Sequence, residues 1–275
     1  MAEALLASAE EEMIICAAGD IHGALDRLYA DVLAFEAELG VRFEHLLHVG
    51  DFGIWPDPDR VDKATRKHEG AGDFPRWIEE GREAPRPTTF IKGNHEDFVW
   101  LDEQPDGVVL LGLRYLRNGE VVDIKGGDGA IRVGGLGGCF GPSDYDRRSP
   151  NLQGYARRHY TRDEVEALCK RRGLDVLLLH DAPAGVEIVK HRREGNHHRY
   201  VSEAAGLAEA VAATRPRVCF FGHHHRRVDA EVAGVQCVGL NIVGWPGNLV
   251  AVDLPARGRN WSVLGEWPLE KPDRT

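Results

Sequence analysis

The sequence Met13-Ile14-Ile15-Cys16-Ala17-Ala18-Gly19-Asp20-Ile21-His22-Gly23, residues 13–23, decides the fold. Six apolar residues lead directly into Asp-Ile-His between glycines, and so short an apolar run is typical of a buried strand. The arrangement recurs where apolar runs precede Gly50-Asp51, His180-Asp181 and Gly222-His223-His224-His225. In open α/β sheets the functional groups lie just past the carboxyl ends of the strands. We therefore expect an α/β fold that gathers these polar residues on one rim.

A fifth motif, Gly93-Asn94-His95-Glu96, follows the strand-like stretch 88–92 and completes the set. Together the motifs offer two carboxylates, one amide oxygen and four imidazoles, and these donors are suited to Mn, Fe or Zn. A single histidine is usually an ordinary core or surface residue, whereas five motifs in this order are a specific signal. The candidate metal ligands are Asp20, His22, Asp51, Asn94, His180, His223 and His225.

The order Asp-x-His, Gly-Asp, Gly-Asn-His-Glu, His and Gly-His-x-His resembles the signature of the calcineurin-like metallophosphoesterase superfamily. The resemblance implies two mixed β-sheets packed as a sandwich and flanked by helices. It also implies two divalent metal ions, which need a bridging anion when they lie about 3.5–4 Å apart, and a metal-bridging hydroxide that attacks phosphorus. The first ion is implied to bind Asp20, His22 and His225. The second is implied to bind Asn94, His180 and His223, and the bridge between them is Asp51.

Several polar residues adjoin the candidate ligands. The resemblance makes His95 a general acid or hydrogen-bond donor beside the leaving group, and a positioned acid is worth roughly 10²–10⁴-fold in rate. The alternative is that His95 only holds the ligands in place. Glu96 and Asp181 are interpreted as groups that orient ligands. His224 lies between two candidate ligands on a strand-like stretch, so we expect its side chain to point the opposite way.

Further stretches resemble the catalytic domain of RNA lariat debranching enzymes, which cut a 2′,5′-phosphodiester. The resemblance covers about residues 13–250, and its motifs are Gly50-Asp51-Phe52, Gly93-Asn94-His95-Glu96, Leu110-Leu111-Gly112, 131–138, 159–162 and 178–183. Asp20 stands where many eukaryotic debranching enzymes carry Cys, and the match ends without their C-terminal domain. The Ala-, Arg- and Gly-rich composition is typical of prokaryotic proteins. We therefore expect a substrate other than a spliceosomal lariat.

These observations predict a metal-dependent phosphoesterase that hydrolyses a phosphodiester in nucleic acid or a nucleotide. One alternative is a small-molecule phosphomonoesterase or nucleotide hydrolase, which the motifs equally allow. A second alternative is a scaffold that binds a partner without catalysis, and the complete ligand set argues against it. The expected partner is a phosphate-ester substrate, and the sequence leaves the oligomeric state open.

The long loop at residues 141–160 combines basic and aromatic residues, a mixture suited to phosphates and stacked bases. In debranching-like enzymes the matching loop meets the substrate. The chain carries a formal net charge of −10, but its basic residues gather in the second half, and a solvated surface is the competing interpretation. The candidate substrate-binding residues are Arg147, Arg148, Arg157 and Arg158. The histidines whose role stays open are His159, His191, His197 and His198.

We expect one metallophosphoesterase catalytic domain at residues 13–255, with terminal extensions at 1–12 and 256–275. No apolar run is long enough to cross a bilayer, and the apolar stretch at residues 4–7 is too short for a signal peptide. Cytoplasmic residence without a membrane partner is the expectation. The five cysteines are an odd number without close pairing, which argues against a disulfide framework.

The spacing of apolar residues predicts a helix over 24–39 that ends at Gly40. Thr161, with Glu164 three residues later, predicts a helix that begins with a capping box. A second amphipathic helix is expected over 202–214, and residues 56–87 are expected to form an irregular insertion with one short helix. Short strand-like pieces between 108 and 135 predict an antiparallel meander.

Overall fold

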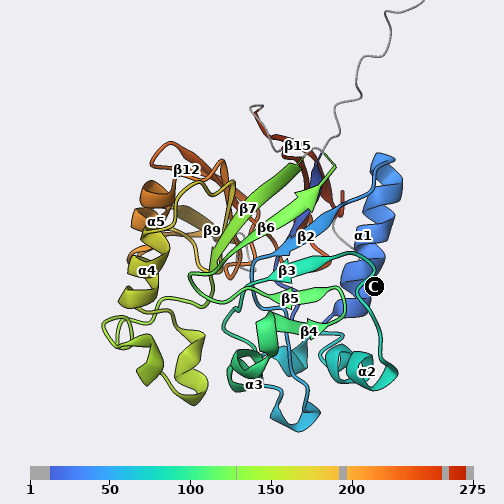
Figure 1. Ribbon diagram of the computed structural model, residues 1–275, viewed down its shortest axis with the longest axis horizontal. Coiled ribbons are helices and arrows are strands. Elements are labelled where there is room, and N and C mark those ends of the chain that lie inside the picture. Colours follow the sequence, from blue (N-terminus) through green and yellow to red (C-terminus); the bar gives the residue numbers. More distant parts are fainter. Residues whose placement is uncertain (1–12, 128, 192–196, 256–259, 271–275) are drawn as a thin grey trace, which may run out of the picture.

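Two β-sheets face each other in the computed structural model, which describes residues 13–127, 129–191, 197–255 and 260–270 (Figure 1). The apolar layer between them comes from alternate residues of both sheets, including Ile15, Leu47, Val176 and Phe220. Because successive side chains of a strand point to opposite faces, the other residues of these strands meet the helices outside. The predicted sandwich flanked by helices is confirmed.

The larger sheet has seven strands in the order β15-β14-β1-β2-β3-β5-β4. β1, β2, β3 and β5 are parallel, and β14, β15 and β4 add antiparallel edges. The bounds are β1 (Ile14–Ala18), β2 (His45–His48), β3 (Thr88–Phe90), β4 (Val108–Leu110), β5 (Leu113–Tyr115), β14 (Leu249–Asp253) and β15 (Ser262–Trp267).

The second sheet has six strands in the order β12-β13-β11-β8-β7-β6. Its centre is parallel, and β12 and β6 pair antiparallel at the edges. The bounds are β6 (Val121–Gly126), β7 (Gly129–Leu136), β8 (Val176–Leu179), β11 (Val218–Phe221), β12 (Val228–Val232) and β13 (Val235–Gly239). A separate two-stranded sheet pairs β9 (Glu187–His191) antiparallel with β10 (His197–Val201).

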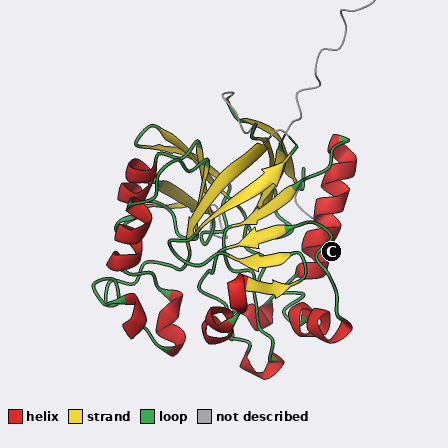
Figure 2. Cartoon of the chain, viewed as in Figure 1, coloured by secondary structure: helices red, strands yellow, loops and turns green. Residues whose placement is uncertain are grey.

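The helices cover the outer faces of the two sheets (Figure 2). Residues of α1 (Leu25–Leu39) and α2 (Asp73–Glu80) pack against the larger sheet, and α4 (Arg162–Cys169) and α5 (Leu207–Thr214) pack against the second. The short elements are α3 (Phe98–Glu103), η1 (Pro58–Arg60), η2 (Thr65–Lys67), η3 (Pro105–Gly107), η4 (Ser149–Asn151) and η5 (Gly154–Arg158).

Most predicted helices are confirmed. α1 ends at Gly40 in the left-handed conformation (φ 67°), and α4 begins with the expected capping box at Thr161. The helix expected over 202–214 begins only at Leu207, because the Ser202 hydroxyl donates to the Ala182 carbonyl and holds the preceding segment against β8's end. α2 is the one α-helix of the described insertion at 56–87.

Two segments differ from the sequence-based expectations. The pieces at 108–135 divide between the sheets instead of forming one meander, because β5 pairs parallel with β3 while β6 and β7 pair in the second sheet. Within the expected C-terminal extension, β15 completes the edge of the larger sheet against β14. The N-terminal extension 1–12 lies outside the described residues. Among the described helices, none is long and apolar enough to span a membrane.

Candidate metal centre

The seven candidate ligands come from five strands that end at the same rim. Asp20 and His22 follow β1, Asp51 follows β2 and Asn94 follows β3 in the larger sheet. From the second sheet, His180 follows β8, and His223 and His225 follow β11. The structure therefore brings together all seven residues that the sequence motifs single out, where the carboxyl ends of both sheets meet.

Glycines let the turns that carry the candidate ligands approach each other closely at this rim. A Cβ on Gly93 would lie 2.1 Å from both the backbone nitrogen and Oδ1 of Asp51, and one on Gly222 would lie 2.3 Å from Oδ1 of Asp20. No other residue fits such contacts without displacing the carboxylates. The Gly-Asn and Gly-His pairs of the motifs thus place their polar partners against these aspartates.

The first group of donors consists of Asp20, His22, Asp51 and His225, whose ligand atoms all lie within 4.8 Å of one another. His225 Nε2 is 3.0 Å from Asp20 Oδ2 and 3.3 Å from His22 Nε2. His22 Nε2 is 3.8 Å from Asp51 Oδ2. Two carboxylates and two imidazoles thus point at one small volume, and three of these side chains are buried.

The second group shares Asp51 with the first and adds His180 and His223. His180 Nε2 is 3.5 Å from Asp51 Oδ1 and 3.0 Å from Asn94 Oδ1. The other ring nitrogen, His180 Nδ1, lies 2.8 Å from the Val49 carbonyl oxygen. That contact fixes the proton on Nδ1 and leaves Nε2 as an acceptor, as a metal-binding imidazole requires.

The electrostatics of these groups suit divalent cations. Burial, followed by the charges of Asp20 and Glu96, raises the pKa of Asp51 well above its usual value. Burial also lowers the pKa of His22 and of His223 to about 3, so both imidazoles are neutral and keep a lone pair. Cations bind deprotonated ligands and would offset the clustered negative charge. The donor set therefore fits two divalent ions.

The backbone around the ligands is strained. Seven described residues other than glycine have a positive φ, and four of them are the candidate ligands His22, Asp51, His223 and His225. A left-handed conformation costs such residues free energy and persists where the surrounding structure enforces it, often at functional sites. This concentration separates the ligand turns from ordinary strand ends.

His95 lies beside the first group, with its ring centroid 5.3 Å from that of His22. Its Nδ1 is 2.8 Å from Asp62 Oδ2. Burial alone lowers the pKa of His95, but the hydrogen bond and charge of Asp62 outweigh it and the net direction is upward. Sequence reasoning missed Asp62, because it lies in the irregular insertion where no motif or periodicity marks it.

The neighbours of the ligands behave partly as expected. Glu96 accepts hydrogen bonds from the backbone nitrogens of Phe52 (2.7 Å) and Gly93 (3.1 Å), so it fixes two ligand turns. The outward direction expected for the His224 side chain assumed that His224 lies on a strand. β11 ends at Phe221, and both His223 and His225 have a left-handed backbone, so strand alternation does not apply to His224. Its Nε2 lies 2.9 Å from Asp181 Oδ1, so it holds this acid at the margin of the second group.

The remaining histidines are placed outside the two groups where the structure describes them. His45 Nε2 lies 2.8 Å from Thr89 Oγ1, and His48 is buried and accepts from the Gly50 nitrogen, so both serve as residues of β2. His159 Nδ1 lies 2.7 Å from Asp144 Oδ2. The structure describes the backbone but not the side chains of three further histidines, His191, His197 and His198.

Three of the four arginines of the 141–160 loop have partners within the protein. Arg147 pairs with Asp144 at 2.7 Å, and Arg157 pairs with Asp102 at 2.6 Å. The guanidinium carbon of Arg158 lies 4.1 Å above the Tyr155 ring. An incoming phosphate would compete with these contacts, so the substrate-binding role of these residues and of Arg148 stays a prediction.

Two groups of oxygen and nitrogen donors share one carboxylate where the carboxyl ends of the strands of both sheets meet. This combination of fold and site is that of a metal-dependent phosphoesterase. The family model of calcineurin-like phosphoesterases matches residues 13–227, and the chain belongs to this family, whose members hydrolyse phosphoester bonds with divalent metals. The resemblance noted from the motifs is thereby confirmed.

Curated relatives include lariat debranching enzymes. That of Entamoeba histolytica is 24% identical over 94% of this chain and 79% of its own length. Those of Schizosaccharomyces pombe and Gallus gallus are 28% and 29% identical, each over 78% of this chain. The chain spans 48% and 42% of those two relatives. A solved structure from Staphylococcus aureus, in complex with α-ketoglutarate, shares the fold with a TM-score of 0.55 at 17% identity, covering 96% of this chain and 55% of that one.

Proposed function

We propose that this protein is a phosphodiesterase that acts on nucleic acid or a nucleotide and depends on two divalent metal ions. The observation that carries the proposal is the pair of donor groups that share Asp51. The similarity to lariat debranching enzymes supports a diester substrate and a nucleic-acid component. The proposal extends to Mn, Fe or Zn as the metal, because the donors are oxygens and imidazole nitrogens.

The proposed ligand roles rest on which side chains face each other. Asp20, His22 and His225 would hold one ion. Asn94, His180 and His223 would hold the other, and the shared ligand would be Asp51, since its Oδ2 faces the first group and its Oδ1 the second. Divalent ions bound at these residues would stabilise negative charge on the phosphoryl oxygens and lower the pKa of a bound water molecule.

His95 is proposed to donate a proton to the leaving oxygen. Its Nδ1 is engaged by Asp62, which leaves Nε2 as the atom that can face a substrate. Because the pKa of His95 is raised, the imidazole is protonated in a larger fraction of the protein molecules at a given pH. An alkoxide leaving group needs such a proton, and positioned acids contribute roughly 10²–10⁴-fold to rate.

The test compares bis(p-nitrophenyl) phosphate with p-nitrophenyl phosphate on protein reconstituted with Mn²⁺. We expect the diester to be hydrolysed with the higher kcat/KM and EDTA to abolish the reaction. Dinucleotides with 2′,5′ and 3′,5′ linkages would then define the nucleic-acid substrate. A faster reaction with the monoester would favour a phosphomonoesterase or nucleotide hydrolase, and undiminished activity in EDTA would contradict the metal dependence.

A further inference from the structure

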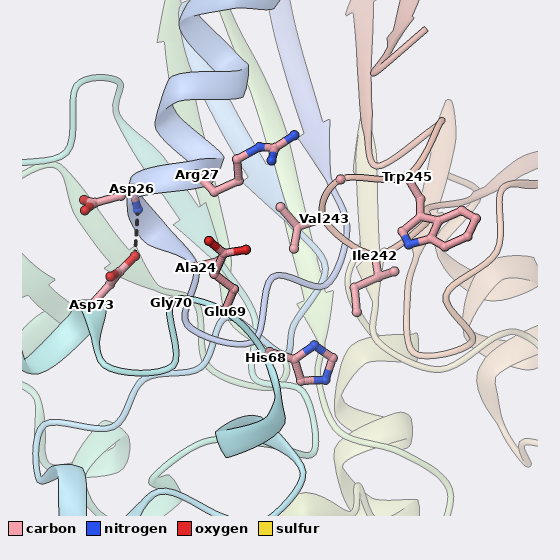
Figure 3. A pocket seen from close by; sticks show the side chains of 11 residues that line it. Ala24, Asp26, Arg27, His68, Glu69, Gly70, Asp73, Ile242, Val243 and Trp245 are labelled. Carbon is pink, nitrogen blue, oxygen red and sulfur yellow. Dashed lines mark hydrogen bonds between the residues drawn. The ribbon is translucent and has the colours of Figure 1, made fainter. Parts of the chain in front are cut away.

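A pocket of about 530 Å³ lies beside the first donor group (Figure 3). One wall comes from the start of α1 and the segment 68–73, and the opposite wall comes from the loop Ile242–Trp245 after β13. The volume lies in the range of small-molecule sites, about 300–1,000 Å³, and suits one nucleoside. None of the sequence motifs points to this pocket.

Two contacts connect the pocket to the proposed metal centre. The ring of His68, which lines the pocket, stacks on His22 with centroids 4.2 Å apart and planes inclined by 9°. On the other wall, the backbone nitrogen of Val243 donates to the carbonyl oxygen of Asp20 at 2.8 Å. The pocket therefore adjoins the donor groups, so that one substituent of a substrate with its phosphate at these groups could reach it.

The lining is apolar on one wall and acidic on the other. Figure 3 shows the side chains of Ile242, Val243 and Trp245 on the apolar wall. The charged lining residues are three acids and one arginine. Two of the acids, Asp26 and Asp73, are paired with Arg76, and Arg27 is paired with Asp31. The carboxylate that remains is that of Glu69, which would repel a second phosphate, so the pocket favours the uncharged part of a substrate.

We propose that this pocket binds the nucleobase of the substrate, with Trp245 as the stacking surface; this inference rests on the proposed phosphodiesterase function. A base is flat and neutral, and stacking on an aromatic ring favours it. Among the described residues, none forms a hydrogen bond or ion pair with the Glu69 carboxylate. An ionised carboxylate only accepts hydrogen bonds. Glu69 therefore favours bases with an exocyclic amino group, such as adenine, over uracil.

The experiment measures binding rather than turnover. The full chain reconstituted with Mn²⁺ is titrated calorimetrically with the 5′-methylene phosphonates of adenosine, uridine and ribose, in which carbon replaces the cleavable ester oxygen. We expect the adenosine compound to bind most tightly and the ribose compound most weakly. Trp245→Ala should weaken the adenosine compound about 5- to 150-fold, since stacking one base is worth ~1–3 kcal/mol, and leave the ribose compound unchanged. Trp245→Phe should retain most of the preference.

Two further variants make the assignment specific. Glu69→Ala should bring the adenosine compound down to the affinity of the uridine compound, whereas the matched change Glu79→Ala, on the exposed face of α2, should change neither. Tyr155→Ala removes an exposed aromatic of the 141–160 loop and should also change neither. Dependence on Tyr155 instead of Trp245 would place the base on that loop and overturn the proposal.

The outcomes separate this inference from the proposed function. Equal affinities for the three phosphonates, or no binding of any, would refute the base pocket even if bis(p-nitrophenyl) phosphate is hydrolysed. The predicted binding pattern in a protein that hydrolyses no phosphodiester would support the pocket and contradict the phosphodiesterase.

Discussion

Replacing Asp62 by Asn tests how the His95 side chain is held. Asp62 Oδ1 accepts from the backbone nitrogens of Ala64 (2.7 Å) and Thr65 (2.9 Å), and an Asn carbonyl oxygen can keep both contacts. The amide NH₂ would then take the position of Oδ2, 2.8 Å from His95 Nδ1. A donor there forces Nδ1 to become an acceptor, which is incompatible with the doubly protonated ring that a proton donor requires.

The magnitude follows from the strength of this contact. The side chains of His95 and Asp62 are 18% and 17% exposed, so the pair is largely shielded from water. A hydrogen bond to a charged group contributes about 1.5–3 kcal/mol. If the contact acts fully in the transition state, its loss lowers kcat about 10- to 150-fold at 1.36 kcal/mol per tenfold. KM should stay the same, because Asp62 is not proposed to contact substrate.

The assay compares two leaving groups. With a dinucleotide, whose alkoxide needs a proton, Asp62→Asn should show the full loss. With bis(p-nitrophenyl) phosphate the loss should nearly vanish, because p-nitrophenolate leaves without protonation. Combining the change with His95→Ala should add no further loss. The matched control is Asp59→Asn, an exposed acid of the same insertion, which should leave both rates unchanged. An equal loss on both substrates would refute the positioning role.

Two other predictions concern the loop and the rim. The arginine pairs of the 141–160 loop are Arg147 with Arg148 and Arg157 with Arg158. Changing both arginines of one pair to Ala should raise KM for an oligonucleotide and flatten the salt dependence of KM, because fewer backbone phosphates would be neutralised. Unchanged oligonucleotide cleavage would count against contact with nucleic acid. Gly93→Ala should displace Asp51 and lower both metal content and kcat, since its Cβ would lie 2.1 Å from Asp51 Oδ1. The control Gly72→Ala meets nothing within 4 Å and should change neither, and full metal content in Gly93→Ala would contradict the packing argument.

The candidate ligands could be predicted from sequence because each follows an apolar run or a compact motif. Parallel strands that share an orientation bring such residues to one edge, so the local pattern already specifies the meeting point. Asp62, His68 and Trp245 carry no such signal. They reach the site from irregular segments, whose course is set by tertiary contacts such as the stacking of His68 on His22.

Side-chain direction and strand pairing were harder to predict. The outward orientation expected for His224 assumed strand alternation, but β11 ends at Phe221 and left-handed residues follow. β5 has only three residues, too few for a periodic signal. Its parallel pairing with β3 is accompanied by burial of Leu113 and Tyr115 in the core that α1 also lines, and α1 is distant in sequence. Local sequence does not encode either outcome.

The most direct test of the account is the metal content of the protein and of Asp51→Ala. Both are reconstituted with Mn²⁺, freed of unbound metal and measured by elemental analysis, with circular dichroism to confirm that the variant is folded. Because Asp51 faces both donor groups, we predict close to two ions per chain in the unaltered protein and the loss of most of both in the variant. No bound ion in the unaltered protein, or full retention in the folded variant, would contradict a metal centre built around Asp51.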